Sequence, residues 1–486
     1  MNVKQAVVVI HGIGEQIPMD TVRGFVSVVS PIPKDPNKPR FWSKPDPMSE
    51  LFELRKLTTP QSKDMPPTDY FEYYWAYQAE GTKIAHIIAW AWSLLVRRPG
   101  NVPKHLKPLW WTLWGLLAGA LGFYASGYWG QLSASNTRAS YLLSLLFTAA
   151  GFVISGFVIN YVGDAARYLN PSPTNIKMRR NIRQQGVELL KKLHEPEYAY
   201  DRIVVVGHSL GSVIAYDIIR HLWPQFNQRD GYPPETDLTA LAAVEAAGES
   251  LPAKPPSASV VGFRNLQREL WEKELSLKNR WRVTDLVTIG SPLAHAALLL
   301  ARKKSDLDER ENERELPTCP PVPDNGEYGY DPGAQARAKD KKERKRYVLH
   351  HAAAFACTRW TNLYFPAALG FFGDLVGGPL QEIFGPGIQD VPVKSAEWGG
   401  FLQHTPLIHT HYWNPKTLPS ASQASPNQPA PTQATTKPPW ALKAVQDAIG
   451  LNSRDWLSQA PPAKPAPAAE SSDAETPPPE DDDVPF

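Results

Sequence analysis

Residues 202–211 read RIVVVGHSLG, and this stretch is the strongest indication of the fold. The run from Arg202 to Val206 is β-branched and apolar with no breaker, which is typical of a buried parallel strand. Residues 207–211 then form a G-x-S-x-G pattern, and residues 212–219 can form a helix. In such an elbow, a sharp strand-to-helix turn lifts the serine hydroxyl clear of the sheet. The sequence therefore predicts that Ser209 is a nucleophile.

Two features of the elbow favour this interpretation over an accidental turn. Side chains at Gly207 and Gly211 would collide with neighbouring backbone. The following helix would point its N-terminal amides and positive dipole end at the place where an oxyanion forms. The bare pattern also arises by chance in chains of this length, because glycine and serine are common residues. The flanking strand and helix are what make it specific.

A second apolar strand is predicted at residues 6–10, and it ends in His11, Gly12, Ile13 and Gly14. An HG turn after the first strand resembles the oxyanion loop of lipases and esterases in the α/β-hydrolase superfamily. The resemblance implies that the backbone amides of Ile13 and Leu210 form the oxyanion hole. Loss of one such donor typically costs about 3 kcal/mol of transition-state stabilisation. Considered without Ser209, the HG pair is explained equally well as an ordinary turn at the end of a strand.

Further motifs follow in order along the chain: TIGSPL at residues 288–293, W-x-N-x-Y at 360–364, D-x-V-G at 374–377 and H-T-x-Y-W at 409–413. The first two belong to strands predicted at residues 285–293 and 359–365. Together with GHSLGS at 207–212, this succession resembles a lipase-like group of α/β-hydrolases that is often found in bacterial genomes. The resemblance covers the segments around residues 1–25, 68–78, 175–220, 283–300 and 355–413. It implies an α/β-hydrolase fold, which is a mostly parallel sheet flanked by helices.

The same resemblance implies the partners of the serine, since this superfamily runs in the order serine, acid, histidine. It makes Asp374 the acid and His409 the general base, although Leu375 stands where the family usually has proline. Asp390 is the alternative acid. His411 is the alternative base, because residues two apart on an extended segment face the same way.

The remaining histidines are expected to have other roles. His404 is a more remote candidate for the base. His208 is expected to pack beside the serine on the wrong side of the turn, and His350 and His351 to be ordinary surface or core residues.

The expected mechanism is nucleophilic catalysis through an acyl-enzyme. His409 takes the proton of Ser209, Asp374 orients the imidazole, and two amides hold the tetrahedral oxyanion. No cofactor is expected. The sequence has neither an H-E-x-x-H motif, nor Cys/His ligand spacing, nor a phosphate-binding G-x-x-x-x-G-K-[ST] loop.

Two long uncharged runs predict a membrane hairpin. Residues 109–137 and 139–163 carry no charged side chain, and only Arg138 separates them. Each run is long enough for one span of about 20 residues, and we place the spans at about 109–130 and 140–162. Tryptophan and tyrosine gather at both ends of the first run, as in interfacial belts. The alternative is a pair of buried helices in a large soluble core.

Basic residues flank the hairpin on both outer ends, which predicts that both termini and the catalytic domain are cytoplasmic. These residues are Arg97, Arg98, Lys104 and Lys107 before it and Arg167, Lys177, Arg179, Arg180 and Arg183 after it. Residues 84–96 are too short to span and are expected to form an interfacial helix or, equally, a core helix.

Composition agrees with an intracellular enzyme. The net charge of +2 over 486 residues gives no reason to expect a nucleic-acid partner. Two cysteines, Cys319 and Cys357, build no disulfide framework and suit a reducing compartment. The N-terminus runs directly into a core strand, so no secretory signal peptide is expected.

The expected domain organisation is a hydrolase domain with one insertion and one tail. Residues 1–83 and 166–414 form the hydrolase domain, and 84–165 form the membrane insertion. Residues 224–280 are a candidate lid or, equally, a surface decoration, with Phe263, Leu266 and Leu270 on one helical face. Residues 302–346 are expected to be a charged, solvated loop. Residues 415–486 are rich in proline and alanine, end in an acidic run and are expected to be disordered. A short helix at 440–457 is conceivable there, on an unidentified protein partner.

These features together predict a membrane-anchored serine hydrolase that cleaves carboxylic esters, with the lipid bilayer as partner and lipid or other acyl esters as substrate. A thioesterase or amidase with the same triad is the first alternative. A catalytically silent membrane scaffold of the same fold is the second.

Overall fold

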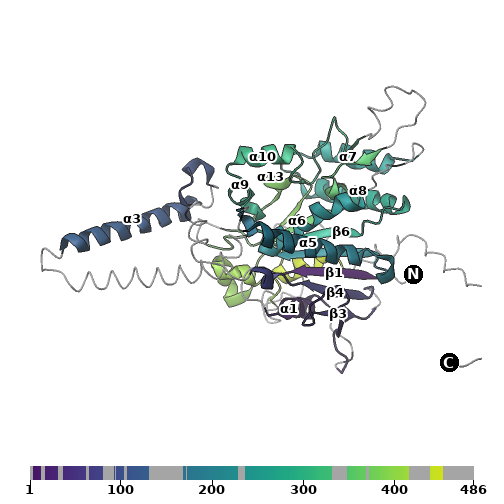
Figure 1. Cartoon of the computed structure of the whole chain (residues 1–486), viewed down its shortest axis with the longest axis horizontal. Coiled ribbons are helices and arrows are strands. Elements are labelled where there is room, and N and C mark those ends of the chain that lie inside the picture. The colour runs from purple at the N-terminus through teal and green to yellow at the C-terminus, as the bar shows by residue number, and fades with distance from the viewer. Residues whose placement is uncertain are drawn as a thin grey trace, which may run out of the picture.

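The computed structural model describes residues 4–12, 17–30, 35, 37–61, 65–79, 92, 95–102, 107–130, 168–170, 172–173, 175–227, 232, 236–330, 347–367, 372–414 and 438–451. Within these ranges an eight-stranded sheet is the centre of the molecule (Figure 1). Its strand order is β10 (Gln389–Pro392), β9 (Arg359–Tyr364), β6 (Val283–Ile289), β5 (Arg202–His208), β1 (Gln5–Ile10), β4 (Thr68–Tyr73), β3 (Arg55–Thr59) and β2 (Trp42–Pro45). Neighbours from β10 to β4 are parallel, and β3 is antiparallel to both of its neighbours.

The central strands are buried on both faces, as their continuous apolar runs predict. All residues of β1 and β6 and the first six of β5 are buried. Side chains alternate between the two faces: Val204 and Val206 belong to one apolar cluster, while Ile203 and Val205 belong to the other. The prediction of an α/β chain with a mostly parallel sheet is therefore confirmed.

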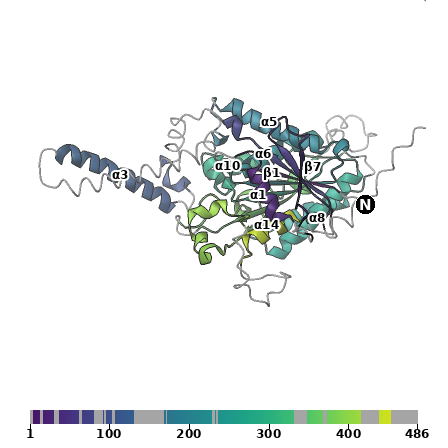
Figure 2. The same ribbon diagram turned by 90° about the horizontal axis from the view of Figure 1, so that it is seen from below.

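Helices cover both faces of this sheet (Figure 2). On the face of Ile203 lie α5 (Ile176–Leu193), α6 (Leu210–Phe226), α7 (Thr239–Ser250), α8 (Ser257–Ser276) and α12 (Ala354–Cys357). On the face of Val204 lie α1 (Asp20–Val29) and α14 (Ala441–Ile449). The shorter elements are η1 (Ala76–Ala79), η2 (Pro99–Asn101), η4 (Pro196–Tyr198), η5 (Pro292–His295), α9 (Ala296–Leu299), α10 (Lys304–Asn312), β7 (Gly329–Tyr330), β8 (Val348–Leu349), α13 (Gln381–Phe384), η6 (Glu397–Gly400), η7 (Leu402–His404) and η8 (Pro406–Thr410).

Helix α14 corrects the expectation that residues 415–486 are a disordered tail. Its residues Ala441, Val445 and Ile449 are buried in the cluster that contains α1 and the central strands. Before the helix, the backbone of residues 439–441 pairs with Lys394, just beyond β10. The helix lies within residues 440–457, where the sequence allows a short helix, but it packs on the protein's own core and not on a separate partner. Residues 415–437 and 452–486 lie outside the described residues.

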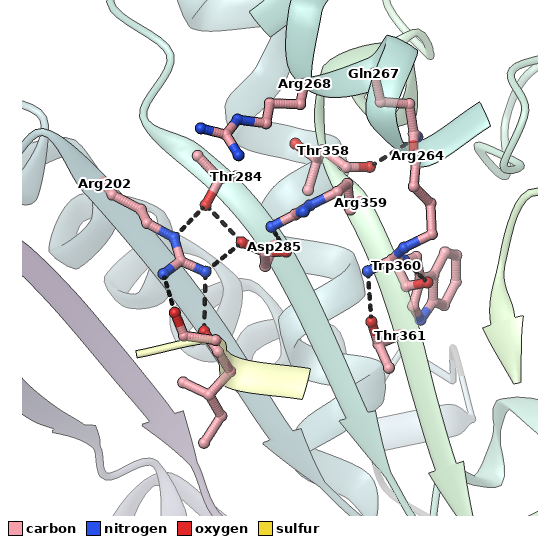
Figure 3. A network of polar contacts seen from close by, with 12 residues as sticks. Arg202, Arg264, Gln267, Arg268, Thr284, Asp285, Thr358, Arg359, Trp360 and Thr361 are labelled. Atoms are coloured by element: carbon pink, nitrogen blue, oxygen red, sulfur yellow. Dashed lines mark hydrogen bonds and ion pairs between the residues drawn. The ribbon is translucent and has the colours of Figure 1, made fainter. Parts of the chain in front are cut away.

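A buried polar network at the amino ends of the strands ties α14 to the sheet (Figure 3). Arg202 on β5 donates to the carbonyl oxygens of Ile449 and Gly450 at distances of 2.9 and 3.2 Å, and it forms a 2.7 Å ion pair with Asp285 on β6. Arg359 on β9 binds the other carboxylate oxygen of Asp285 at 2.7 Å. Burial favours the neutral acid, but the charges of Arg359 and Arg202 lower the pKa of Asp285 to about 2.

We expect Ile449→Ala to lower the free energy of unfolding by about 3 kcal/mol, because it opens a cavity between α14 and the sheet. Lys443→Ala, on the exposed side of the same helix, is the matched control and should cost less than about 0.5 kcal/mol. Urea unfolding of both variants measures the difference. Equal, small effects of the two substitutions would show that α14 is not part of the folded core.

Two segments between β5 and β9 also differ from expectation. Helix α8 buries Phe263 and Leu270 against the core and donates from Arg264 to the carbonyl of Trp360 on β9, so this helix flanks the sheet. Residues 304–312 of the predicted charged loop form α10, which is anchored by the buried Leu307. Residues 331–346 lie outside the described residues.

Residues 109–130 of the first uncharged run lie in α3 (Lys107–Gly130), which extends away from the sheet in Figure 1. Near its start, Trp110 and Trp114 donate to the carbonyl of Leu95, and Arg97 donates to the carbonyls of Ala301 and Arg302 at 3.1 and 3.2 Å. Among the helices that the structure describes, none combines the length and the mean hydropathy of a membrane span. The second predicted span, Arg138 and most of residues 84–96 lie outside the described residues.

Candidate active site

Ser209 occupies the turn between β5 and α6 in a strained backbone conformation. Its φ of 52° and ψ of −128° lie where residues other than glycine are rarely found. The turn is fixed on both sides: the amide of Ser209 donates to the carbonyl of Ile289 at 2.9 Å, and the amide of Ser212 donates to the carbonyl of Ser209 at 3.0 Å. Strain held by the surrounding structure is characteristic of functional positions.

Both glycines of the elbow are required by close backbone contacts. A Cβ atom at Gly207 would lie 2.5 Å from the Cα of Ser212, and a Cβ at Gly211 would clash with the carbonyl oxygens of Ile10 and His11. The second contact shows that α6 begins directly against the end of β1. The elbow and the loop after β1 are therefore neighbours, as the sequence predicts.

Asp374 and His409 are brought together although 35 residues separate them. Nδ1 of His409, in η8, lies 3.0 Å from each carboxylate oxygen of Asp374. The carboxylate also accepts hydrogen bonds from the hydroxyl of Tyr412 at 2.6 Å and from the amides of Val376 and Gly377 at 2.8 and 3.0 Å. A carboxylate can only accept, so Nδ1 carries a proton, and in the neutral imidazole Nε2 is then the nitrogen with the lone pair.

The environment of Asp374 keeps it ionised. The side chain is fully buried, which favours the neutral acid, but His409, Tyr412 and the amide of Gly377 hold its pKa well below its usual range. An ionised acid that contacts Nδ1 of a histidine is the group that orients a general base and stabilises its imidazolium.

His409 lies beside the elbow. A Cβ atom at Gly290 would come within 2.9 Å of the His409 ring, and Gly290 directly follows Ile289, whose carbonyl accepts the amide of Ser209. Nε2 of His409 is buried and has no hydrogen-bond partner among the described residues. No hydrogen bond joins this nitrogen to the Ser209 hydroxyl among the described residues, and catalytic hydrogen bonds of this kind commonly form only when substrate binds.

The loop after β1 packs against the serine. A Cβ atom at Gly12 would lie 2.8 Å from the Cβ of Ser209. The His11 ring stacks on Trp75 with centroids 5.2 Å apart and its Nδ1 donates to the carbonyl of Gly12 at 2.8 Å. Burial lowers the pKa of His11 to about 4, so this ring is neutral and holds the peptide that follows Gly12.

The structure describes only one of the two backbone amides predicted to form the oxyanion hole. Leu210 is the first residue of α6, so its amide has no acceptor within the helix and remains available. Ile13 lies outside the described residues.

The alternative acid and base have other partners. Asp390 accepts the amides of Leu380 and Gln381 at the start of α13 and the side-chain amide of Asn362, and none of its partners among the described residues is a histidine. His411 pairs through Nδ1 with Glu397 at 3.0 Å. His404 is exposed, His350 is buried and His351 is exposed. The geometry thus favours Asp374 and His409 over the alternatives.

His208 has a closer relation to the base than the sequence suggests. Its ring stacks on that of His409 with centroids 5.0 Å apart, and its Nε2 donates to the backbone carbonyl of His409 at 2.9 Å. Burial and the neighbouring His409 lower the pKa of His208 to about 3, so it stays neutral. The contact joins residues 201 positions apart, and no local sequence pattern could reveal it. The hydrogen bond from Tyr412 to Asp374 was not predicted either, although the H-T-x-Y-W motif contains Tyr412.

With the ester hydrolysis predicted from the sequence as the readout, we expect His208→Leu to lower kcat about 10-fold with KM nearly unchanged, because the carbonyl of His409 loses its donor and the predicted base is no longer held in place. His208→Gln keeps an N–H at a similar reach and should recover most of kcat. His194→Leu is the matched control, since His194 is another buried histidine bonded to a backbone carbonyl, far from the elbow. Equal rates for His208→Leu and wild type would show that the stacked ring does not position the base.

A scan against protein-family models, a search of curated proteins and a search of solved structures found no match to this chain. What the site can do is therefore inferred from its own geometry. That geometry contains a strained serine, a neighbouring histidine with a free nitrogen, and an ionised acid behind it.

Proposed function

We propose that this protein is a serine hydrolase of the α/β-hydrolase fold that cleaves carboxylic esters, with Ser209, His409 and Asp374 as its triad. The observation that carries the proposal is the placement of the Asp374–His409 pair beside a serine elbow at the carboxyl ends of the parallel strands. Such edges are where α/β sheets usually bind their ligands.

In the proposed reaction, Nε2 of His409 removes the proton of Ser209 as its Oγ attacks the ester carbonyl carbon. The amides of Leu210 and Ile13 stabilise the oxyanion, while Asp374 stabilises the imidazolium. The imidazolium then protonates the departing alcohol as the ester C–O bond breaks. Water, activated by the same histidine, attacks the acyl-enzyme and releases the carboxylic acid and the free serine.

The proposal is tested by turnover of p-nitrophenyl esters of increasing acyl length by the detergent-purified full chain, with matched thioester and anilide substrates. We expect the ester series to be cleaved fastest. Faster thioester or anilide turnover would favour the thioesterase or amidase alternative. Absence of turnover on all three, with a folded protein, would favour the silent scaffold.

We further propose that the uncharged segment that begins with α3 attaches the enzyme to a membrane as the hairpin predicted from the sequence, at about residues 109–130 and 140–162, although α3 by itself falls below the mean hydropathy of a typical span. Helix α3 has no charged residue after Lys107, and its side chain Trp111 is 57% exposed. Arg97, which precedes α3 in the sequence, donates to the carbonyls of Ala301 and Arg302. These two residues follow α9, the helix that comes after the turn at Gly290. The arm therefore starts near the edge of the sheet that carries the candidate site, which suits esters presented by a bilayer.

The membrane proposal predicts that the protein stays in the membrane fraction after a carbonate wash, which strips proteins held only by charge. A Ser135→Cys variant should react with an impermeant maleimide from outside, while a Ser276→Cys variant, at an exposed position of the catalytic domain, should react only after the membrane is opened. Deletion of residues 105–166 with a short Gly/Ser bridge should give a soluble domain that still cleaves short esters. Release of the intact protein by carbonate would contradict the proposal.

A further inference from the structure

The segment that carries His409 has an apolar outer surface. Trp398, Phe401 and Leu407 are 67%, 64% and 59% exposed, and all three lie within residues 398–407, which run through η6, η7 and the start of η8. We call these three side chains the apolar face. Single exposed apolar residues are ordinary on protein surfaces, whereas several that gather in one place mark an interaction site.

The segment that bears the apolar face is also uncharged. Residues 398–414 contain no Asp, Glu, Lys or Arg, although these four residue types make up 21% of the chain. The acid that directly precedes them, Glu397, is buried and pairs with His411 at 3.0 Å. The partner of such a surface must itself offer apolar groups, and it needs no opposite charge.

The fold holds the apolar face outward. Leu402 and Ile408 of the same segment are buried in the cluster that contains α1 and α14, and they anchor the segment to the core. Trp398 has a φ of 51° and is followed by two glycines with φ of 65° and 90°. The amide of Phe401 closes this turn by donating to the carbonyl of Trp398 at 3.2 Å. A left-handed conformation is unfavourable for a bulky residue, and it persists at functional positions where the surrounding structure holds it.

The apolar face lies at the end of the molecule from which α3 extends. Figures 1 and 2 both show the light-green turns η6 to η8 on the side of the sheet toward α3. The contacts agree with the views: the ring of His409 lies against Gly290, and Arg97, which precedes α3, donates to carbonyls that follow α9. Two other exposed apolar side chains, Ile17 and Phe372, follow β1 and β9 at this edge. A bilayer that held the proposed hairpin would therefore face this end of the catalytic domain.

We propose that the apolar face docks the catalytic domain on the surface of a lipid bilayer. Tryptophan and phenylalanine side chains on an interfacial segment insert at the boundary between headgroups and acyl chains, and a neutral lipid surface requires no charge from the protein. A protein interface usually surrounds its apolar centre with a polar rim, whereas this segment offers no charge from Trp398 to Asn414. Because His409 belongs to the same segment, docking would bring the candidate site to esters within the lipid. The inference rests on the proposed function and names the surface through which a lipid substrate is reached.

Docking is measured first by a readout that needs no turnover. A Phe401→Cys variant of the full chain is labelled with the fluorophore NBD and combined with phosphatidylcholine vesicles whose acyl chains carry a nitroxide quencher. Trp42→Cys is the matched control, because Trp42 is also an exposed aromatic residue but lies on β2, at the opposite end of the strand order from β10. The native Cys319 and Cys357 are buried. We expect the lipid quencher to lower the fluorescence at position 401 by about 2-fold or more and to leave that at position 42 nearly unchanged, because only the apolar face reaches the acyl chains.

The second measurement compares a long-chain ester embedded in vesicles with a short soluble ester. The test variant combines Trp398→Asn, chosen because asparagine tolerates the left-handed conformation, with Phe401→Ser. We expect it to lower turnover of the embedded ester about 10-fold and to change turnover of the soluble ester less than about 2-fold, since removal of two aromatic side chains weakens docking. Trp42→Ser should leave both rates unchanged. Equal loss on both esters would show damage to the site and would contradict a docking role.

The outcomes separate failure of docking from failure of the other proposals. Quenching at position 401 in a chain that cleaves no ester would keep the docking surface and remove the hydrolase. Quenching in a chain that carbonate releases from membranes would keep the surface and remove the hairpin. Equal quenching at positions 401 and 42, or none at either, would overturn the proposal. Fluorescence at position 401 that ignores the lipid quencher but changes with protein concentration would show that a second copy covers the apolar face, and would overturn it as well.

Discussion

Replacing Ser209 with alanine is expected to lower kcat of ester hydrolysis by about six orders of magnitude, which is the size of loss seen when a triad serine is removed. The fold should persist, because only one hydroxyl is removed and both backbone hydrogen bonds of the turn remain. Turnover of a short p-nitrophenyl ester and the thermal unfolding midpoint measure the two effects.

Ser276→Ala is a suitable control for this variant, since Ser276 is an exposed serine at the end of α8. It should leave turnover unchanged. If Ser209→Ala kept most of the wild-type activity, the nucleophile would be elsewhere and the proposed mechanism would be wrong.

Asp374→Asn is expected to lower kcat by about 10⁴. The amide keeps the size of the side chain but can donate a hydrogen to Nδ1, which favours the tautomer with the proton on Nε2 and removes the base. His409→Ala should lose a comparable factor. The acid's low pKa also has a pH consequence: Asp374 should stay ionised in the folded enzyme at mildly acidic pH, and the stability from its ionised contacts should be lost only as the pH falls toward its depressed pKa.

The alternative residues serve as controls for the triad. His411→Ala should reduce kcat far less than His409→Ala, because His411 pairs with Glu397. Asp390→Asn should mainly lower stability, since Asp390 binds the amides at the start of α13. A dead His411→Ala beside an active His409→Ala would reassign the base, and a dead Asp390→Asn would reassign the acid.

Local patterns were enough to predict the parallel strands and the elbow. A buried parallel strand is mostly apolar on both faces, so β1 and β5 appear as continuous apolar runs in the sequence, whereas β6 and β9 also contain buried polar residues such as Asp285 and Asn362. The two glycines around Ser209 are needed for backbone contacts within a few residues or with the adjacent strand. Asp374 and His409 came from a resemblance of motifs, and the structure places them 3.0 Å apart.

Contacts between distant segments could not be predicted in this way. Helix α14 is held by Arg202, which lies 247 residues before Ile449, and its own short sequence is surrounded by proline-rich tail. The face of α8 that holds Phe263 and Leu270 suits a lid and a flanking helix equally well, because a helical pattern shows that a face is buried but not against what. The stacking of His208 on His409 depends on the same kind of distant contact.

The most direct test of the central claim is reaction of the folded full chain with a fluorophosphonate probe, followed by mass spectrometry of the labelled peptide. We predict one adduct on Oγ of Ser209, no adduct in Ser209→Ala, and much slower labelling in His409→Ala, because the probe needs a serine activated by its base. A folded wild-type protein that does not label, or that labels at a residue other than Ser209, would contradict the proposal that this site is a serine hydrolase centre.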